Sequence, residues 1–192
     1  MNWMHNRVCR SGWWRSKVQH DLLPWVLRGI DLGGNPIEIG PGPGLTSEVL
    51  SKRCISLTCI EINPILAAAL HARLGNGNVI VKQGDAAAMP FPDDTFSGAA
   101  CFTMLHHVPS AHLQDRVLKE AFRVIRPGAW LAGSDSKTSL PFRLLHIADT
   151  MVVCDPDVFG ERLVKAGFNQ VSVVQSKKSF SFRGRKPEMN CS

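Results

Sequence analysis

Residues 36–46 read Pro-Ile-Glu-Ile-Gly-Pro-Gly-Pro-Gly-Leu-Thr, a short apolar run that meets a glycine-rich turn. Ile37 and Ile39 are typical of a buried strand, which we expect to end at Gly40. The glycines of the turn have no Cβ, so the chain can turn tightly and a ligand can approach the backbone closely. A helix that begins near Thr46 would direct its free N–H groups and its positive dipole end toward that ligand. This order of elements is how an open α/β sheet builds a nucleotide site.

The next two predicted strands each lead into an acidic residue. The strand at residues 56–61 ends in Glu61, about 20 residues beyond the glycine-rich turn, where an acid that binds ribose is expected in such folds. The strand at residues 78–83 is followed directly by Gly84, Asp85 and Ala86. Ligands of open α/β sheets bind outside the carboxyl ends of the strands. We therefore expect both acids to lie beside the glycine-rich turn.

Strands and helices alternate along most of the chain. Apolar runs predict further strands at residues 96–105, 129–135, 171–176 and 179–185. Helical spacing and capping residues predict helices at residues 46–53, 64–74, 110–125 and 155–167. This alternation implies right-handed crossovers and a parallel sheet, and the last two strands are typical of a hairpin at its edge. The sequence therefore predicts an α/β protein with a Rossmann-like, doubly wound, mostly parallel sheet and helices on both faces.

Two local features complete this plan. In the helix at residues 64–74 we expect the inward face to consist of Ile65, Leu66, Ala69 and Leu70. The residues Arg126, Pro127 and Gly128 are expected to turn the chain from the preceding helix into the fifth strand.

Residues 1–31 precede the first predicted strand and are expected to form an N-terminal helical segment. A helix is predicted over part of residues 16–28, either bent at Pro24 or beginning near it. Apolar residues recur at helical spacing in this segment, namely Val18, Leu22, Leu23, Val26 and Leu27. Trp3, Trp13 and Trp14 allow two interpretations: their rings pack this helix onto the domain, or the segment caps the cofactor site. Residues 32–192 then make up the main domain. Within it, residues 136–154 break the alternation and are predicted to form a short cap on the acceptor side.

Composition and charge indicate an ordinary globular protein. The chain has 192 residues, of which 44% are hydrophobic and 20% are charged, and this length suits a single domain with a sizeable core. The net charge of +6 favours an acidic partner only where positive side chains gather. The densest group of basic residues is Lys177, Lys178, Arg183, Arg185 and Lys186. These residues straddle the predicted hairpin, so we expect a solvated strand face there.

Cysteine spacing and apolar runs exclude two further classes of protein. The six cysteines form no C-x-x-C pair and show no zinc-site spacing to histidine, so we expect no metal site. The longest apolar run, residues 98–105, is too short to span a bilayer. The first fifteen residues lack the apolar block of a secretory signal, so a cytoplasmic location is expected.

The chain resembles the class I S-adenosylmethionine-dependent methyltransferases, in particular their UbiE-like small-molecule branch. The resemblance rests on six motifs in the order of that family, and it covers roughly residues 32–186. They are EIGPGPG at residues 38–44, EIN at 61–63, GDA at 84–86, MPFPDDTF at 89–96, LHHV at 105–108 and EAFRVIRPG at 120–128. The resemblance implies that the last strand inserts antiparallel into the sheet.

The resemblance also implies which residues bind S-adenosylmethionine and, after the reaction, S-adenosylhomocysteine. The glycine-rich turn would face the methionine part and the ribose through Gly40, Pro41, Gly42 and Gly44, with Glu38 beneath it. Glu61 would accept both ribose hydroxyls, which suits the two oxygens of a carboxylate. Gly84, Asp85 and Ala86 would bind the adenine edge. Ile62 and the region of Cys101 and Phe102 would sandwich the adenine or the methionine part.

His106 and His107 follow the fourth predicted strand, at the edge of the sheet where ligands bind. An imidazole titrates near neutral pH, so either residue is a candidate general base for methyl transfer. The competing interpretation is that the pair fixes its loop through backbone hydrogen bonds. Asp135, at the end of the fifth strand, is a weaker candidate of the same kind.

Other functions fit the sequence less well. Ribosomal RNA adenine dimethyltransferases share the glycine-rich turn, but they carry Asn-Leu-Pro-Tyr after the fourth strand, where this chain reads Cys-Phe-Thr-Met-Leu at residues 101–105. A metal-dependent catechol-type enzyme would need acids there, and a dehydrogenase would need the turn G-x-G-x-x-G. A protein that binds S-adenosylmethionine without catalysis remains an alternative. We therefore expect methyl transfer to a small organic acceptor, and we do not expect a nucleic-acid partner.

Overall fold

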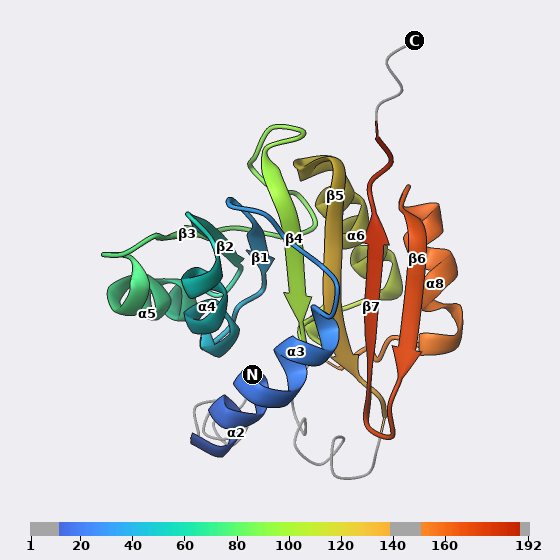
Figure 1. Ribbon diagram of the computed structural model, residues 1–192, viewed down its shortest axis with the longest axis horizontal. Helices are drawn as coiled ribbons and strands as arrows, with labels where there is room; N and C mark the ends of the chain where they lie inside the picture. Colours follow the sequence, from blue (N-terminus) through green and yellow to red (C-terminus); the bar gives the residue numbers. More distant parts are fainter. Residues whose placement is uncertain (1–11, 139–150, 189–192) are drawn as a thin grey trace.

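The computed structural model describes residues 12–138 and 151–188, apart from the side chains of Trp13 and Trp14. These residues form one seven-stranded sheet with the strand order β3-β2-β1-β4-β5-β7-β6 (Figure 1). The strands are β1 (Ile37–Ile39), β2 (Leu57–Glu61), β3 (Val79–Gln83), β4 (Phe96–Phe102), β5 (Ile125–Ser136), β6 (Asn169–Gln175) and β7 (Ser179–Arg185). Strands β1 to β5 pair in parallel, whereas β7 runs antiparallel to both β5 and β6. The predicted α/β class and the antiparallel last strand are confirmed.

Helices cover both faces of this sheet (Figure 1). Their bounds are α2 (Gly12–Lys17), α3 (Leu23–Val26), α4 (Leu45–Leu50), α5 (Pro64–Leu74), α6 (Ala111–Val124) and α8 (Pro156–Lys165). A π-helical turn (Val18–Leu22) joins α2 to α3, and short 3₁₀ turns occur at Ser51–Arg53 and Leu105–His107. Helices α6 and α8 share one hydrophobic cluster with the sheet, and α3, α4 and α5 share the other. The predicted doubly wound arrangement is confirmed.

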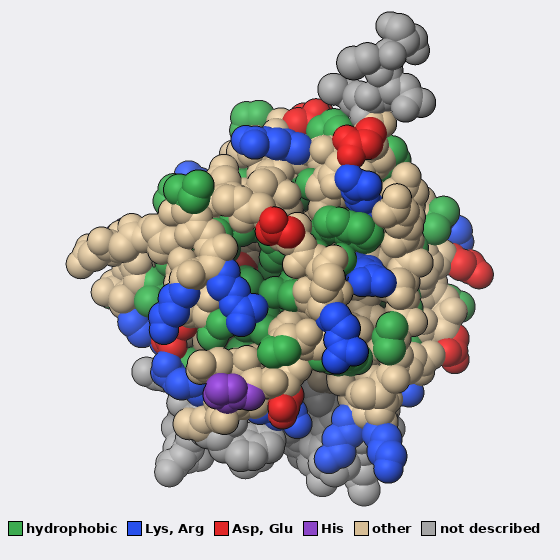
Figure 2. Space-filling view, viewed as in Figure 1, with side chains coloured by type: hydrophobic (Ala, Val, Ile, Leu, Met, Phe, Trp, Pro, Cys, Tyr) green, Lys and Arg blue, Asp and Glu red, His purple; other side chains and the backbone are tan. Residues whose placement is uncertain are grey.

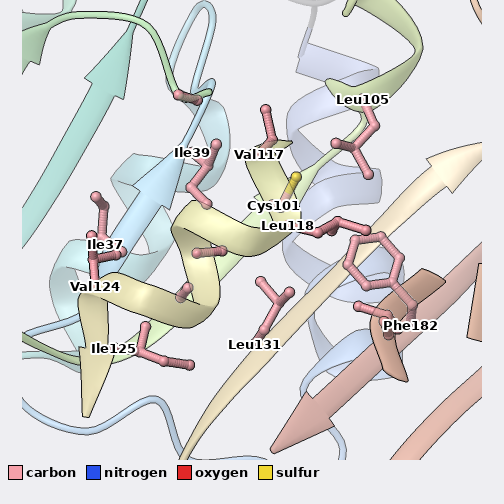
Figure 3. Packing of buried hydrophobic residues seen from close by; sticks show 14 of the residues in the cluster. Ile37, Ile39, Cys101, Leu105, Val117, Leu118, Val124, Ile125, Leu131 and Phe182 are labelled. Atoms are coloured by element: carbon pink, nitrogen blue, oxygen red, sulfur yellow. The ribbon is translucent and has the colours of Figure 1, made fainter. Parts of the chain in front are cut away.

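Helix α6 carries much of the core behind the central strands. Figure 3 shows Val117, Leu118 and Val124 on the helix face that meets Ile37 and Leu131 of the sheet. Leu118 is 1% exposed, and burial of such a side chain stabilises the fold by about 1.5–3 kcal/mol. This packing fixes α6 against the strands whose carboxyl ends carry the candidate site.

The boundaries of β4 and β5 differ from those predicted. Strand β4 ends at Phe102 instead of residue 105, because Thr103 has a φ of +49°, which extended backbone does not adopt. Strand β5 begins at Ile125, which already pairs with Phe96, so residues 126–128 do not form a separate turn. The register shifts between this pair and the next, where Gly98 pairs with Trp130. The chain thus enters β5 through a bulge that the sequence does not predict.

The buried face of α5 also differs from the prediction. Leu70 is buried and Leu66 is half-buried, in agreement with the prediction. Ile65, however, is 77% exposed and Ala69 is exposed, whereas Ala67 is buried. The helix carries apolar residues on all sides, so hydrophobic spacing could not determine which side meets the sheet. The bounds of α5 are those predicted.

The basic group near the hairpin is less solvated than expected. Lys177 and Lys178 are exposed, but Arg183 and Arg185 are half-buried because β7 lies inside the sheet, between β5 and β6. Their guanidinium groups lie 6.0 and 5.9 Å from the ring centroid of Trp130. The prediction of a solvated strand face is therefore wrong for β7. Figure 2 shows Lys and Arg distributed over the visible face and not gathered in one block.

The N-terminal helical segment packs against the sheet. Val18, Leu23 and Val26 are buried in the same cluster as Phe102 and Ala132. Trp3 lies outside the described residues, so the two interpretations of the tryptophans stay open. Most of the predicted cap at residues 136–154 also lies outside them.

Candidate functional site

The glycine-rich turn leaves β1 in a left-handed backbone conformation. The φ angles are +62° at Gly40, +54° at Gly42 and +76° at Gly44, a region that residues with a Cβ rarely adopt. A Cβ at Gly42 would meet no atom within 4 Å, so the space above this residue is open. A Cβ at Gly40 would come within 2.8 Å of the Met104 side chain. The turn therefore presents an open backbone surface at Gly42 and a closed one at Gly40.

Glu61 joins this turn to the end of β2. Its Oε2 accepts a hydrogen bond of 3.0 Å from the Gly42 N–H, and its Oε1 accepts one of 2.9 Å from the Asn63 N–H. The Gly84 N–H donates to the Glu61 carbonyl at 3.0 Å, which brings the end of β3 to the same place. The glycine-rich turn, Glu61 and Gly84 thus share one edge of the sheet, as the sequence predicted.

The loop that follows Asp85 is held in place by α6. The exposed Asp85 accepts a hydrogen bond of 2.8 Å from the Ala87 N–H, and Ala86 beside it is buried. Arg123 donates to the carbonyl groups of Met89 at 3.0 Å and Phe91 at 2.8 Å. Its neighbour Glu120 accepts from the Met89 N–H at 2.7 Å, and the Arg123 guanidinium lowers the pKa of Glu120.

These contacts explain two of the sequence motifs. The motif at residues 120–128 supplies the side chains that fix the loop formed by the motif at residues 89–96. The two motifs therefore pack together and fix the loop that follows Asp85.

Glu38 lies beneath the turn and is fully buried. Its carboxylate accepts hydrogen bonds from the Thr46 hydroxyl and, at 2.5 Å, from the Ser47 hydroxyl. Burial raises the pKa of Glu38, and the two hydroxyl donors oppose that rise. A side chain with no exposed surface cannot reach a ligand directly. Glu38 therefore orients the first turn of α4, which sequence analysis did not specify.

Two arginines pair with Glu48 of α4, and one of them also contacts the glycine-rich turn, a feature that sequence analysis missed. Arg73 of α5 donates to the Pro43 carbonyl, and its guanidinium lies 2.8 Å from Oε1 of Glu48 on α4. The other oxygen of Glu48 pairs with Arg15 of α2. The N-terminal helical segment is thus tied to the helix that follows the glycine-rich turn. No local signal marks these pairs, because their members lie about thirty positions apart (30 for Arg73 with Pro43 and 33 for Arg15 with Glu48).

The residues expected to sandwich the ligand differ in exposure. Ile62 is 66% exposed beside Glu61, as an apolar surface for a flat ring requires. Cys101 and Phe102 are buried, and their side chains pack in the two hydrophobic clusters on opposite faces of the sheet. The alternation of β4 sends both side chains into the core. The residue that lies against the turn is instead Met104, which sequence analysis missed.

The turn after β4 contains the two candidate histidines. His106 is 2% exposed, and its Nδ1 forms a hydrogen-bond contact with Oδ1 of Asp135, the fully buried residue near the end of β5. The His106 N–H donates to Oδ2 of the same carboxylate at 3.0 Å, and the Ser136 N–H donates to Oδ1 at 2.6 Å. His107 is half-buried, and its ring centroid lies 4.2 Å from that of His106. The structure therefore brings His106 and Asp135 together, which sequence analysis did not foresee.

Gln114 of α6 anchors the same turn to the segment that precedes α8. Its Nε2 donates to the carbonyl groups of Leu105 at 3.0 Å and Val152 at 2.7 Å. The Val152 N–H in turn donates to the His106 carbonyl at 2.8 Å. Cys154 donates to Gln114 Oε1, and burial raises the pKa of this thiol to about 12. His106 thus contacts Asp135, which directly precedes residues 136–154, and Val152, which lies near the end of that segment.

Other kinds of site were sought among residues 12–138 and 151–188. This part of the chain contains no group of three or more His, Cys, Asp or Glu side chains that would suit a metal ion. Nor does any helix within it have the length and apolar character needed to cross a bilayer.

Comparison with known protein sequences gives a consistent family. A family model described as "Methyltransferase domain" matches residues 37–133. Over 129 residues the chain is 30% identical to the ubiquinone biosynthesis O-methyltransferase of Pseudomonas fluorescens strain Pf0-1, which covers 60% of this chain and 54% of that protein. It is 30% identical over 142 residues to sterol methyltransferase-like 3 of Botryococcus braunii. That match covers 70% of this chain and 36% of that protein. The chain thus spans about half the length, or less, of these curated relatives.

Comparison with solved structures supports the fold. A SAM-dependent methyltransferase from Aquifex aeolicus superposes with a TM-score of 0.73 at 21% identity, covering 96% of this chain and 98% of that one. A second structure is phosphoethanolamine N-methyltransferase 2 of Haemonchus contortus, solved with phosphomonomethylethanolamine and S-adenosylhomocysteine. It gives a TM-score of 0.73 at 12% identity, and the match covers 96% of this chain and 59% of that chain. At these identities the likeness concerns the fold alone.

Proposed function

We propose that this chain, which belongs to the class I S-adenosylmethionine-dependent methyltransferases of the UbiE-like type, transfers a methyl group to a small organic acceptor. The observation that carries the proposal is the contact between Glu61 and Gly42. A buried carboxylate there receives the N–H of a left-handed glycine whose outer side is open. This is the environment that a ribose beside a glycine-rich turn requires.

The residues at this edge fit S-adenosylmethionine. Glu61 would accept hydrogen bonds from the two ribose hydroxyls, and Gly42 lets the ligand approach its backbone. The exposed side chain of Ile62 offers an apolar surface for the adenine ring. The exposed carboxylate of Asp85 lies on a loop fixed by α6 and suits the adenine amino group. Gly40, Pro41, Gly44, Gly84 and Ala86 would line the cofactor through their backbone.

The protein has a limited chemical task in such a reaction. S-adenosylmethionine supplies a methyl group that the sulfonium already activates. The residues of the chain must hold the acceptor in line with that group, exclude water and accept a proton where the acceptor carries one. His106 and His107, in the turn after β4, are the proposed proton acceptors. Cys101 and Phe102 support this region from the core and border it through their backbone.

A small organic acceptor is favoured over RNA. Two curated relatives are named for ubiquinone biosynthesis and for sterol methylation, both of which concern small molecules. Figure 2 shows Lys and Arg scattered among other side chains on the visible face, whereas nucleic-acid binding favours a continuous basic stripe. We propose that residues 136–154 cap the acceptor and that residues 1–31 pack beside the cofactor site, tied there by Arg15 and Glu48.

The cytoplasm is the proposed location. The four cysteines of the described residues, Cys54, Cys59, Cys101 and Cys154, are all free thiols. Free thiols are the rule in reducing compartments.

Titration calorimetry with the full chain tests the cofactor. We expect binding of S-adenosylmethionine and S-adenosylhomocysteine and no binding of NAD. Binding of NAD alone would overturn the proposal.

Transfer of a radiolabelled methyl group tests the acceptor. The label should enter a small-molecule extract and not total RNA. Label in RNA would favour the nucleic-acid alternative. Cofactor binding without transfer to either pool would favour a protein that binds S-adenosylmethionine without catalysis.

A further inference from the structure

We propose that a hollow between α3 and the β6–β7 part of the sheet is a second ligand site, which binds the phosphate group of a small phosphomonoester. Arginines, serines and an apolar wall line this hollow, namely Arg28, Arg183, Ser172, Ser181, Trp25 and Val174. None of these residues takes part in the glycine-rich turn, the loop after β3 or the turn after β4. The inference therefore goes beyond methyl transfer and does not depend on it.

The alternation of β7 places the hollow on the face of the sheet opposite α8. Phe180 and Phe182 turn toward α8, where their ring centroids lie 5.3 and 4.8 Å from that of Phe159. Successive side chains of a strand point to opposite faces. Ser181 and Arg183 therefore lie on the other face, against which α3 packs (Figure 1).

The floor of the hollow is a small block of paired residues. Val174 of β6 pairs with Ser181 of β7, and Ser172 pairs with Arg183. Side chains that face each other in this way have Cβ atoms about 5 Å apart, so one small ligand can reach both hydroxyls and the guanidinium. The chain that follows α3 closes the hollow, because the Arg28 carbonyl accepts a hydrogen bond of 3.4 Å from Nη1 of Arg183.

The positive charge of the hollow is not balanced within the described chain. Neither Arg28 nor Arg183 has an ion-pair partner among residues 12–138 and 151–188. Arg183 donates to the Arg28 carbonyl and lies beside the Trp130 ring, so the described residues use few of its N–H donors. A guanidinium matches the oxygens of a phosphate or a carboxylate. Two such groups beside one hollow indicate an anionic ligand.

Unused hydroxyl groups support the same conclusion. In the part of the chain that the structure describes, the hydroxyls of Ser172 and Ser181 have no hydrogen-bond partner. Ser134 of β5 pairs with Ser181 and is 1% exposed, and its hydroxyl lacks a partner there as well. Buried polar groups are nearly always hydrogen-bonded. A bound oxyanion would accept a hydrogen bond from Ser181, which leaves the Ser181 oxygen to accept one from Ser134.

The size and the donors of the hollow favour a phosphate group. Its volume is about 190 Å³, below the roughly 300–1,000 Å³ of sites for drug-sized ligands, so it suits one small group. Its donors come from β6, β7 and the chain after α3. The oxygens of a tetrahedral phosphate meet donors from such different directions better than a flat carboxylate does. Trp25 and Val174 offer an apolar wall for the organic part of the ligand.

The strand order separates this hollow from the proposed cofactor edge. Strands β4 and β5 lie between β1 and β7. Neighbouring strands are about 4.8 Å apart, so β7 lies roughly 14 Å from β1. We therefore expect the phosphomonoester and S-adenosylhomocysteine to bind independently of each other.

Titration calorimetry of the full chain with phenyl phosphate, at fixed ionic strength, tests the site. We expect saturable binding that excess S-adenosylhomocysteine does not displace, and weaker binding of inorganic phosphate and of benzoate. In Arg28→Gln the affinity for phenyl phosphate should fall about 10-fold, because the charge-assisted bonds of that exposed guanidinium are lost. Arg53→Gln removes the same charge at an exposed site beyond α4 and is the matched control, which should bind as the wild type does.

Nuclear magnetic resonance locates the bound ligand. In protein labelled with ¹⁵N at arginine, phenyl phosphate should shift the Nε–H signals of Arg28 and Arg183. These signals are assigned by their absence in Arg28→Gln and Arg183→Lys. Ser181→Ala should also weaken the binding of phenyl phosphate, with S-adenosylmethionine affinity unchanged.

Each outcome has a separate meaning. An equal loss in Arg28→Gln and Arg53→Gln would reveal mere attraction to the net positive charge, and displacement by S-adenosylhomocysteine would move the phosphate to the cofactor edge. Either result would overturn the inference, as would a lack of saturable binding or tighter binding of inorganic phosphate or benzoate. A chain that binds phenyl phosphate but not S-adenosylmethionine would instead remove the proposed function and leave this site in place.

Discussion

The Gly42 N–H lies 3.0 Å from Oε2 of Glu61, so the turn after β1 and the end of β2 are joined by a hydrogen bond to a charged group. Such bonds are roughly twice as strong as those between neutral groups. Glu61 therefore holds the turn in its left-handed form, and in the proposed function it has a second task, to present its carboxylate to a ribose.

Glu61→Gln tests the second task. The amide keeps one acceptor oxygen but loses the charge and the second acceptor, so we expect affinity for S-adenosylmethionine to fall about 10-fold or more. Calorimetry measures this change. Glu161→Gln, on the exposed surface of α8, is the control and should bind as the wild type does. Equal affinity in the two variants would place the ribose elsewhere.

Gly42→Ala separates backbone strain from ligand contact. The new Cβ meets no atom within 4 Å, but it must adopt a φ of +54°, so we expect a loss of about 1 kcal/mol in the free energy of unfolding. The Cβ also enters the space where the ligand would approach, and cofactor affinity should fall as well.

Gly29→Ala is the matched control for that variant. Gly29 has a φ of +69°, and a Cβ at this position would also meet no atom within 4 Å, but the residue lies outside the turn. Urea unfolding should show similar losses for both variants, while calorimetry should show weaker cofactor binding only for Gly42→Ala. Weaker binding in both would mean that strain alone explains the effect.

Glu38→Gln should change how stability depends on pH. Burial raises the folded-state pKa of Glu38 above the ordinary value of 4.5. A raised pKa gives stability that is fully present below the unfolded-state pKa and is lost as pH rises through the folded-state value. Glutamine does not titrate, so the variant should gain stability relative to the wild type as the pH rises above the ordinary value of 4.5. Urea unfolding across this range checks the sign, and a difference that does not vary with pH would contradict it.

Lys186→Met tests an anchor near the end of the described chain. The Lys186 ammonium lies 2.6 Å from Oδ1 of Asp94 and 2.9 Å from the carbonyl groups of Phe122 and Ile125. Its removal leaves these acceptors without that donor, so we expect a loss of about 1–3 kcal/mol in the free energy of unfolding. Lys165→Met, at a site where the lysine side chain is 77% exposed, should cost less than about 0.5 kcal/mol.

The parts of this structure that sequence reasoning predicted correctly depend on local chemistry. The helix caps are examples: Asn63 accepts from the Ile65 N–H, Ser110 from the Leu113 N–H and Asp155 from the Asp157 N–H. Each cap needs only residues two or three positions apart. The strands and the shared edge of Glu61 and Gly84 followed from the alternation of elements in the same way.

The parts that it missed depend on contacts between distant residues. His106 and Asp135 lie 29 positions apart in the sequence. Met104, which follows β4, lies beside Gly40, which follows β1. Two of the four residues predicted for the buried face of α5, Ile65 and Ala69, are exposed. Apolar residues occur on all sides of that helix, so hydrophobic spacing did not determine its orientation. The end of β4 depended on the φ angle of Thr103, which its residue type does not reveal.

The insertion of β7 between β5 and β6 has a consequence for synthesis on the ribosome. In this strand order β5 and β6 do not pair with each other. Both pair with β7, which is the last of the described strands along the chain. Until those residues leave the exit tunnel, the nascent chain exposes the unpaired backbone of β5 and the cluster that Phe180 and Phe182 complete. Productive folding therefore has to wait until β7 has been synthesised and has left the exit tunnel, and ribosomes that stop short of β7 would release a chain prone to aggregate.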